Sequence, residues 1–139
     1  MPGFRFHHPI EIRYGDLDPQ GHVNNAKFLT YFEQARIAYI TYLELWPNST
    51  FMDIGIILAE ARVTFLAPVL FGQKIDVGVR VSRLGKKSME MEYSLEETGK
   101  SQELAHGSSA LVAYDYYSQR SIPIPDAWRQ AIQAYEGLV

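Results

Sequence analysis

The sequence predicts an α+β fold, in which an antiparallel sheet of five strands wraps around one long helix and a short helix follows at the end. Three observations support this expectation. Apolar and polar residues alternate in five segments, apolar residues recur every three or four positions in one long segment, and the connections between the later strands are too short for parallel neighbours. The 139 residues, 47% hydrophobic and 21% charged, have the size and balance of a single domain over residues 1–139.

The first half of the chain predicts a strand, a polar loop and the long helix. Even positions from 4 to 14 are mostly apolar, which predicts a strand. Residues 15–22 are rich in Gly, Asp and Pro and predict a loop. A helical apolar stripe then runs from about Ala26 to Leu45, and Asn24 or Asn25 can accept a hydrogen bond from its first amides.

The second half predicts four more strands and the short helix. Alternating residues indicate strands over about 57–65, 75–82, 89–96 and 102–116. Every second residue from Ile57 to Phe65 is expected to share one apolar face. A short terminal helix carries Trp128, Ile132 and Tyr135 at helical spacing. Because a sheet around a single helix leaves an edge strand exposed, we expect two copies of the chain to pair at that edge.

Composition excludes several classes of function. The absence of cysteine excludes disulfides, thiolate nucleophiles and cysteine-bound metals, and the four histidines lack the spacing of metal ligands, so we expect no metal site. Thirteen Lys and Arg against sixteen Asp and Glu give a net charge of -3, which argues against a nucleic-acid partner. No apolar run has the length of a signal peptide or a membrane span, so we expect a cytoplasmic protein without a membrane partner.

The loop before the long helix concentrates the groups that could carry chemistry. It brings Asp16, Asp18 and His22 to the start of the helix, where free amides and the helix dipole can polarise a carbonyl. A carboxylate beside such amides could act as nucleophile or general base on an acyl group while the amides stabilise the oxyanion. The same residues also suit plain turn formation and helix capping, so the spacing alone leaves both interpretations open.

These residues carry a resemblance to a known family. The stretch from Tyr14 to Arg36, with Asp18-Pro19-Gln20-Gly21-His22-Val23-Asn24-Asn25 at its centre, resembles the signature of the 4-hydroxybenzoyl-CoA thioesterase-like family of hotdog-fold acyl-CoA thioesterases. Residues 61–72 and 81–88 are similar to the family's second and third strand segments. The resemblance implies a hotdog fold, hydrolysis of a thioester between an acyl group and coenzyme A, and a homodimer or a dimer-of-dimers tetramer with sites between subunits.

The resemblance also assigns roles to residues. The catalytic aspartate of the family corresponds to Asp18, and the backbone amide that polarises the thioester carbonyl corresponds to Asn25. Coenzyme A is then part of the small-molecule substrate, and no separate cofactor is expected. Several members have aromatic residues where this chain has His22, Asn24 and Asn25, so an aromatic acyl pocket is not carried over. His22 and Asn24 are expected to contact substrate, with a slight preference for aliphatic chains.

A second group of residues could bind the phosphates of coenzyme A. Arg83, Lys86, Lys87 and Ser88 surround a tight turn, and phosphates favour such cations and backbone amides. Arg62 is a weaker candidate for the same role. A solvated hairpin turn is the alternative interpretation of this cluster.

Two other functions remain open at this stage. A hydratase or dehydratase of the same fold would need Asp18 and His22 to cooperate on an enoyl or hydroxyacyl thioester. A non-catalytic acyl-CoA-binding protein would keep the fold without turnover, although a half-buried carboxylate is costly where only an apolar tail must be held. Whether Asp18 attacks the thioester directly or activates a water molecule is also open.

Overall fold

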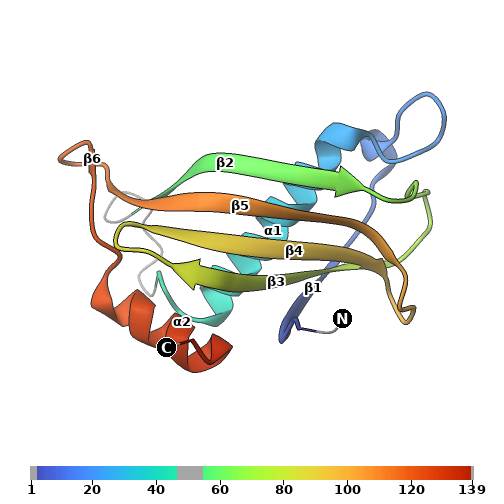
Figure 1. The fold of residues 1–139 in the computed structure, drawn as a ribbon. Helices are drawn as coiled ribbons and strands as arrows, with labels where there is room; N and C mark the ends of the chain where they lie inside the picture. Colours follow the sequence, from blue (N-terminus) through green and yellow to red (C-terminus); the bar gives the residue numbers. More distant parts are fainter. Residues whose placement is uncertain (1–2, 47–54, 139) are drawn as a thin grey trace.

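A computed structural model describes residues 3–46 and 55–138 of the chain. Within these ranges, an antiparallel sheet in the order β1-β3-β4-β5-β2, with β6 beside β5, wraps around helix α1 (Figure 1). The elements are β1 (Phe6–Ile10), α1 (Asn25–Tyr42), β2 (Gly55–Phe65), β3 (Ile75–Leu84), β4 (Ser88–Glu97), β5 (Glu103–Asp115), β6 (Arg120–Ser121) and α2 (Asp126–Glu136). The α+β fold is confirmed, and the two-residue β6 adds a sixth strand to the five expected.

Helix α1 is the centre of the core because its buried face is mostly apolar, with Arg36 as the one charged residue among the buried residues described. Its buried residues include Phe28, Phe32 and Tyr39, and the apolar face of the sheet covers them. The helix ends at Tyr42 and not at the expected Leu45, because Glu44 has a positive φ of 56° and turns the chain away. No helix in the described part of the chain is long and apolar enough to cross a membrane.

The first strand is shorter than expected. It pairs with β3 only from Phe6 to Ile10, opposite Val79 to Ile75, and β3 has no residue left to pair with the chain beyond Ile10. Residues 14–16 form a 3-10 turn, and Tyr14 is 80% exposed. The expected strand over 4–14 is therefore wrong at its second half, because pairing length is set by the partner strand and not by local alternation.

Strand β2 contains a bulge that the alternating pattern did not predict. Its pairing with β5 shifts register between Leu58 and Glu60. As a result, Leu58 and Ala61 line one cavity against α1, and the expectation that Ile57 shares this face is wrong. An extra residue in one strand reverses the inward and outward positions before it. β2 is also an edge of the sheet, and it exposes Leu58 and Phe65, each at 45%.

Helix α2 covers the part of β3 that β1 leaves unpaired. The Glu136 carboxylate accepts hydrogen bonds from the Tyr39 hydroxyl (2.7 Å) and the Val81 amide (3.0 Å). The Trp128 indole donates to the carbonyl of Leu45 (2.8 Å), where the chain leaves α1. These contacts fix α2 at the end of the sheet that lies far from the start of α1 (Figure 1).

Candidate active site

The loop before α1 and the segment at the end of β2 line an open cavity of about 380 Å³ at one end of the sheet. It is lined by Asp18, Gln20, His22, Val23, Asn25, Phe28, Phe65, Leu66, Ala67, Pro68 and Val69. We call this cavity the Asp18 pocket. The structure thus brings together Asp18, His22 and Asn25, and it adds an apolar wall from residues 65–69 that sequence reasoning did not assign to the site.

The Asp18 side chain is held by its own loop. Its Oδ1 atom accepts hydrogen bonds from the backbone amides of Gln20 (2.9 Å) and His22 (3.1 Å). The Asp18 amide in turn donates to the His22 carbonyl (2.7 Å). Gly21 has a φ of +80°, a conformation that favours glycine and allows this tight turn. The bonds to Oδ1 fix the orientation of this half-buried carboxylate in the pocket lining, and Oδ2 takes no part in them.

The start of α1 supplies the amide side of the pocket. Asn24 is the N-cap, and its side-chain oxygen accepts a hydrogen bond from the amide of Ala26 (2.9 Å). Asn24 therefore serves the helix start and is absent from the pocket lining, whereas Asn25 lines it. At a helix start the first amides have no partner within the helix, so they can bind a carbonyl oxygen or an oxyanion.

Asp16 lies two residues before Asp18 but faces a different way. Its Oδ2 atom accepts hydrogen bonds from the Tyr31 hydroxyl (2.7 Å) and the Arg13 amide (3.0 Å), and Lys27 lies 3.9 Å from Oδ1. Burial alone would raise the pKa of Asp16, but these two hydrogen bonds and the charge of Lys27 outweigh it and hold the pKa below its usual range. Of the two aspartates in the loop, only Asp18 lines the pocket.

The wall formed by residues 65–69 is held against the loop by long-range contacts. The Val23 amide donates to the Val69 carbonyl (2.8 Å), and His22 forms an isolated antiparallel β-bridge with Leu70. Phe65 packs edge-on against Phe28 with ring centroids 5.0 Å apart. The alternation of β2 marks Phe65 as apolar, but no local signal connects it to a loop more than 40 positions away.

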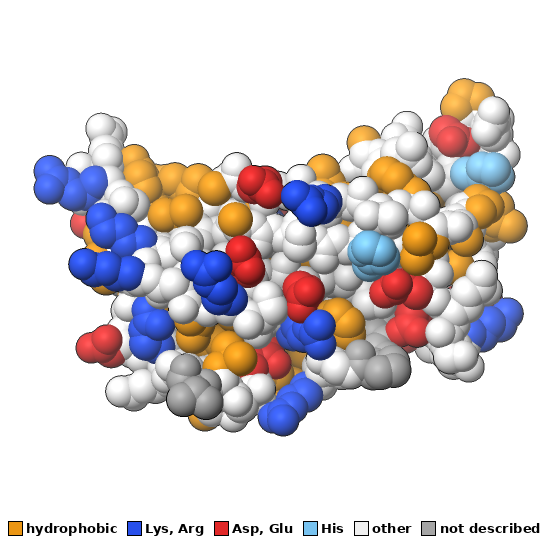
Figure 2. All heavy atoms as spheres, viewed as in Figure 1, with side chains coloured by type: hydrophobic (Ala, Val, Ile, Leu, Met, Phe, Trp, Pro, Cys, Tyr) orange, Lys and Arg blue, Asp and Glu red, His pale blue; other side chains and the backbone are white. Residues whose placement is uncertain are grey.

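The structure separates the predicted phosphate-binding residues from the Asp18 pocket within one chain. Arg83, Lys86, Lys87 and Ser88, here called the basic turn, join β3 to β4. Strand pairing places Phe65 opposite Ala105, and Ala105 opposite Leu95, near the far end of β4. Seven residues of strand, about 23 Å at 3.3 Å each, separate that position from the start of β4. Figure 1 places the connection between β3 and β4 at the left end of the molecule, and Figure 2 shows Lys and Arg side chains gathered at that end.

The basic turn is ordered by contacts with α2. The Gly85 amide donates to the Ser88 carbonyl (2.7 Å), which closes the turn. The Arg129 guanidinium donates to the Gly85 carbonyl (2.6 Å). Arg83, Lys86 and Lys87 remain exposed and available to an anion. Arg62, the weaker candidate, instead lines a polar hollow of about 270 Å³ with Glu60 and Glu90, apart from the Asp18 pocket.

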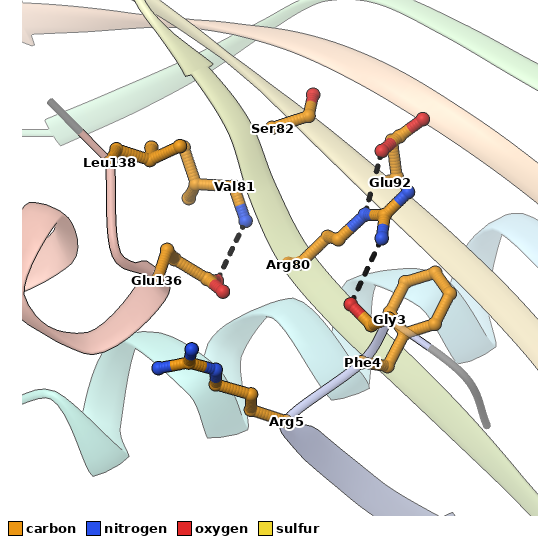
Figure 3. Close-up of a pocket in the computed structure, with 9 residues that line it drawn as sticks. All are labelled: Gly3, Phe4, Arg5, Arg80, Val81, Ser82, Glu92, Glu136 and Leu138. Carbon is orange, nitrogen blue, oxygen red and sulfur yellow. Dashed lines mark hydrogen bonds and ion pairs between the residues drawn. The ribbon is translucent and has the colours of Figure 1, made fainter.

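A further hollow of about 570 Å³ lies between the N-terminal segment, β3 and the end of α2 (Figure 3). Its arginines, Arg5 and Arg80, face two carboxylates, Glu92 and Glu136. Arg80 bonds to Glu92 (2.7 Å) and to the Gly3 carbonyl (2.9 Å), and Glu136 is held by the bonds described above. The formal charges cancel, so this hollow offers no charge excess to a ligand. Among the described residues, no three His, Asp or Glu side chains are grouped as metal ligands.

Comparisons with known proteins identify the family. Residues 12–132 match the model of the Thioesterase-like superfamily. A thioesterase from Thermus thermophilus, crystallised with coenzyme A and Zn, is 37% identical, with 99% of this chain and 98% of that chain covered and a TM-score of 0.85. Long-chain acyl-CoA thioesterase FadM of Escherichia coli (strain K12) is 22% identical over 126 residues, which cover 89% of this chain and 94% of FadM.

An uncharacterised protein of Bacillus subtilis (strain 168), YsmA, is 26% identical over 90 residues. That match covers 65% of this chain and 60% of YsmA, so it spans less than two thirds of that protein. The sheet wrapped around α1 is the hotdog fold of the thioesterase structures it resembles, as the family resemblance implied. The family match over most of the chain, with a solved thioesterase at 37% identity, shows that this protein belongs to the Thioesterase-like superfamily.

Proposed function

We propose that this protein is an acyl-CoA thioesterase, which hydrolyses an acyl-CoA to a free acid and coenzyme A, close to the 4-hydroxybenzoyl-CoA thioesterase-like family. The single observation that carries the proposal is the pairing of a carboxylate with a helix start: Asp18 and Asn25 line the same pocket. The thioesterase from Thermus thermophilus that binds coenzyme A supports this class of substrate.

The two groups divide the chemistry. The Asn25 amide would hold the thioester carbonyl oxygen and stabilise it as it becomes an oxyanion, an effect worth about 100- to 1,000-fold in rate. Asp18 would either attack the carbonyl carbon, expel the coenzyme A thiolate and form an anhydride that water opens, or accept a proton from the water that attacks. In both routes water supplies the hydroxyl of the acid and the proton of the thiol, and Asp18 is regenerated.

The walls of the pocket favour an apolar acyl group. Phe65 and Leu66, which are 45% and 52% exposed, offer carbon surface beside the proposed reacting groups, and the buried Phe28 and Val69 lie behind them. FadM is named as a long-chain acyl-CoA thioesterase. We propose an aliphatic acyl chain, in contact with His22 at the rim of the pocket.

A second copy of the chain would complete the site. The basic turn lies at the opposite end of the sheet from the Asp18 pocket, about 23 Å away along β4, so we propose that the acyl group and the coenzyme A phosphates bind to groups from two different chains. Antiparallel pairing of two β2 edges about a two-fold axis turns one chain end for end, and the basic turn of one copy then lies at the Asp18 end of the other. We propose a homodimer of this kind, or a tetramer built from two of them.

The alternative of a hydratase receives no support from the contacts. It requires the side chains of Asp18 and His22 to work together. The hydrogen bonds between these residues instead use the backbone of His22: its amide donates to Asp18 Oδ1, and its carbonyl accepts from the Asp18 amide.

Acyl-CoA thioesters of graded length and aromaticity, assayed with a thiol-trapping dye, test the proposal. We expect turnover of aliphatic substrates and a loss of at least about 100-fold in kcat for Asp18→Asn, because the nucleophile or base is removed. Asp126→Asn is the matched control, since Asp126 is an exposed carboxylate in the first turn of α2. Full turnover by Asp18→Asn on every active substrate would show that the assignment is wrong.

A further inference from the structure

A part-buried hydrogen bond connects the loop that carries Asp18 to the second turn of α1. The Tyr31 hydroxyl, on a side chain only 2% exposed, donates to Asp16 Oδ2 at 2.7 Å. The Asp16 carbonyl also accepts a hydrogen bond from the backbone amide of Asn24, the N-cap of α1, at 2.8 Å. We call these two contacts the Asp16–Tyr31 brace. Neither Asp16 nor Tyr31 lines the Asp18 pocket.

The brace connects the Asp18 loop to helix α1, which the side-chain hydrogen bonds of Asp18 do not. Asp18 is bonded to Gln20 and His22, which belong to its own loop. Asn25, in contrast, is part of the helix. The separation between the Asp18 carboxylate and the Asn25 amide therefore depends on how the loop is attached to α1, and Asp16 makes that attachment at both its side chain and its backbone.

The protonation states strengthen the bond. Burial raises the pKa of Tyr31, and the hydrogen bond to Asp16 and the negative charge there raise it further, so the hydroxyl stays protonated. The pKa of Asp16 lies below its usual range, so near neutral pH the acceptor is a carboxylate. A hydrogen bond to an ionised acceptor is about twice as strong as one between neutral groups.

We propose that Tyr31 is a positioning residue for thioester hydrolysis, which acts through Asp16 to hold the Asp18 carboxylate at the reacting distance from the Asn25 amide. The inference rests on the proposed function, since it assigns Tyr31 a role in that same reaction. A displacement of about 1 Å in a reacting group can cost about 100-fold in rate. A partial loosening of the loop is expected to cost less.

The test compares two tyrosines of the same helix. Tyr31→Phe and Tyr39→Phe each delete one buried hydroxyl that donates to a carboxylate at 2.7 Å, but Tyr39 bonds to Glu136 on α2, away from the pocket. We expect Tyr31→Phe to lower kcat about tenfold with KM within about twofold, because ground-state binding is kept and alignment is lost. We expect Tyr39→Phe to leave kcat unchanged. Both variants should lower the melting temperature by a similar amount, because each loses one such hydrogen bond.

Variants of Asp16 provide the rescue test. Asp16→Asn keeps an oxygen that can accept the Tyr31 hydrogen, so it should retain more kcat than Asp16→Ala. Adding Tyr31→Phe to Asp16→Ala should cost little more, since the two residues act as one unit. Equal kcat losses in both tyrosine variants, an effect confined to KM, or full kcat in Tyr31→Phe would overturn the role of Tyr31.

The failure of this inference differs from the failure of the proposed function. If the wild-type protein hydrolyses no thioester, or if Asp18→Asn is fully active, the proposed function is wrong. If the wild type is active, Asp18→Asn is inactive and Tyr31→Phe matches Tyr39→Phe, only the role of the brace is wrong.

Discussion

The two ends of the sheet are built in opposite ways. At the Asp18 end, a loop before α1 and a segment after β2 meet from positions more than 40 residues apart, and hydrogen bonds such as Val23 to Val69 hold them together. At the other end, the basic turn is a single local connection between neighbouring strands, ordered by Arg129. The first end has a carboxylate in a pocket with one apolar wall, and the second has exposed cations.

Under the proposed function, this difference would let a chain of 139 residues act on a large anionic thioester. Each chain then has the groups proposed for the acyl end and those proposed for the phosphates at opposite ends of one sheet. In the proposed homodimer, two chains form two complete sites, and each site combines the Asp18 pocket of one copy with the basic turn of the other. Three predictions test this comparison further, beginning with the largest expected effect.

The first prediction separates the two ends kinetically. In Lys86→Ala/Lys87→Ala we expect KM for acyl-CoA to rise about tenfold, equal to about 1.4 kcal/mol, with kcat unchanged, because phosphate binding is weakened and the chemistry is not. Hydrolysis of the matching acyl-pantetheine, which lacks the nucleotide phosphates, should not change. Steady-state kinetics on both substrates measure the effect, and an equal loss on both would contradict a phosphate-binding role.

Mixed dimers provide the control for that prediction. If each site uses Asp18 of one chain and the basic turn of the other, a dimer of Asp18→Asn with Lys86→Ala/Lys87→Ala has one site with both changes and one site with neither. Refolding the two variants together should then produce mixed dimers in which the unchanged site hydrolyses acyl-CoA with the wild-type KM. Recovery limited to the KM of the lysine variant would show that both groups act within one chain.

The second prediction concerns the stability of the folded protein at acidic pH. The pKa of Asp16 lies below its usual range in the folded protein, so its interactions contribute stability above the unfolded pKa of about 3.9 and lose it as pH falls towards the folded pKa. The difference in unfolding free energy between wild type and Asp16→Asn should therefore be largest near pH 7 and shrink below about pH 4. Urea unfolding at several pH values measures it, and a constant difference would contradict the prediction.

The smallest effect concerns the helix start at the Asp18 end. Asn24→Ala removes the cap on the Ala26 amide and should lower the unfolding free energy by about 1 kcal/mol. Asn25→Ala is the matched neighbour, and it should cost less because the cap belongs to Asn24. Thermal unfolding followed by circular dichroism compares the two. Equal destabilisation would show that the cap is not the source of the difference.

Local chemistry made much of the fold and part of the site predictable. The helix, its cap at Asn24 and the loop around Asp18 follow from periodicity and turn residues within a few positions of one another. The early end of β1 and the bulge in β2 were missed, because both depend on which residues of a partner strand are available. The wall at Phe65 was missed for the same reason, since its contact with Phe28 crosses more than 30 positions of sequence.

By itself, the sequence determined the classes of element, the absence of thiol chemistry, and the presence of a carboxylate loop at a helix start, because these depend on residue type and short-range spacing. Only the tertiary structure decided that Asp18 faces the pocket while Asp16 turns towards Tyr31, and that the basic turn lies at the far end of the sheet. Neighbouring residues in a loop can point to different partners, and strand pairing sets distances that spacing along the chain does not contain. The direction of a side chain and the distance between two turns are properties of packing, so they become fixed when the sheet closes around α1.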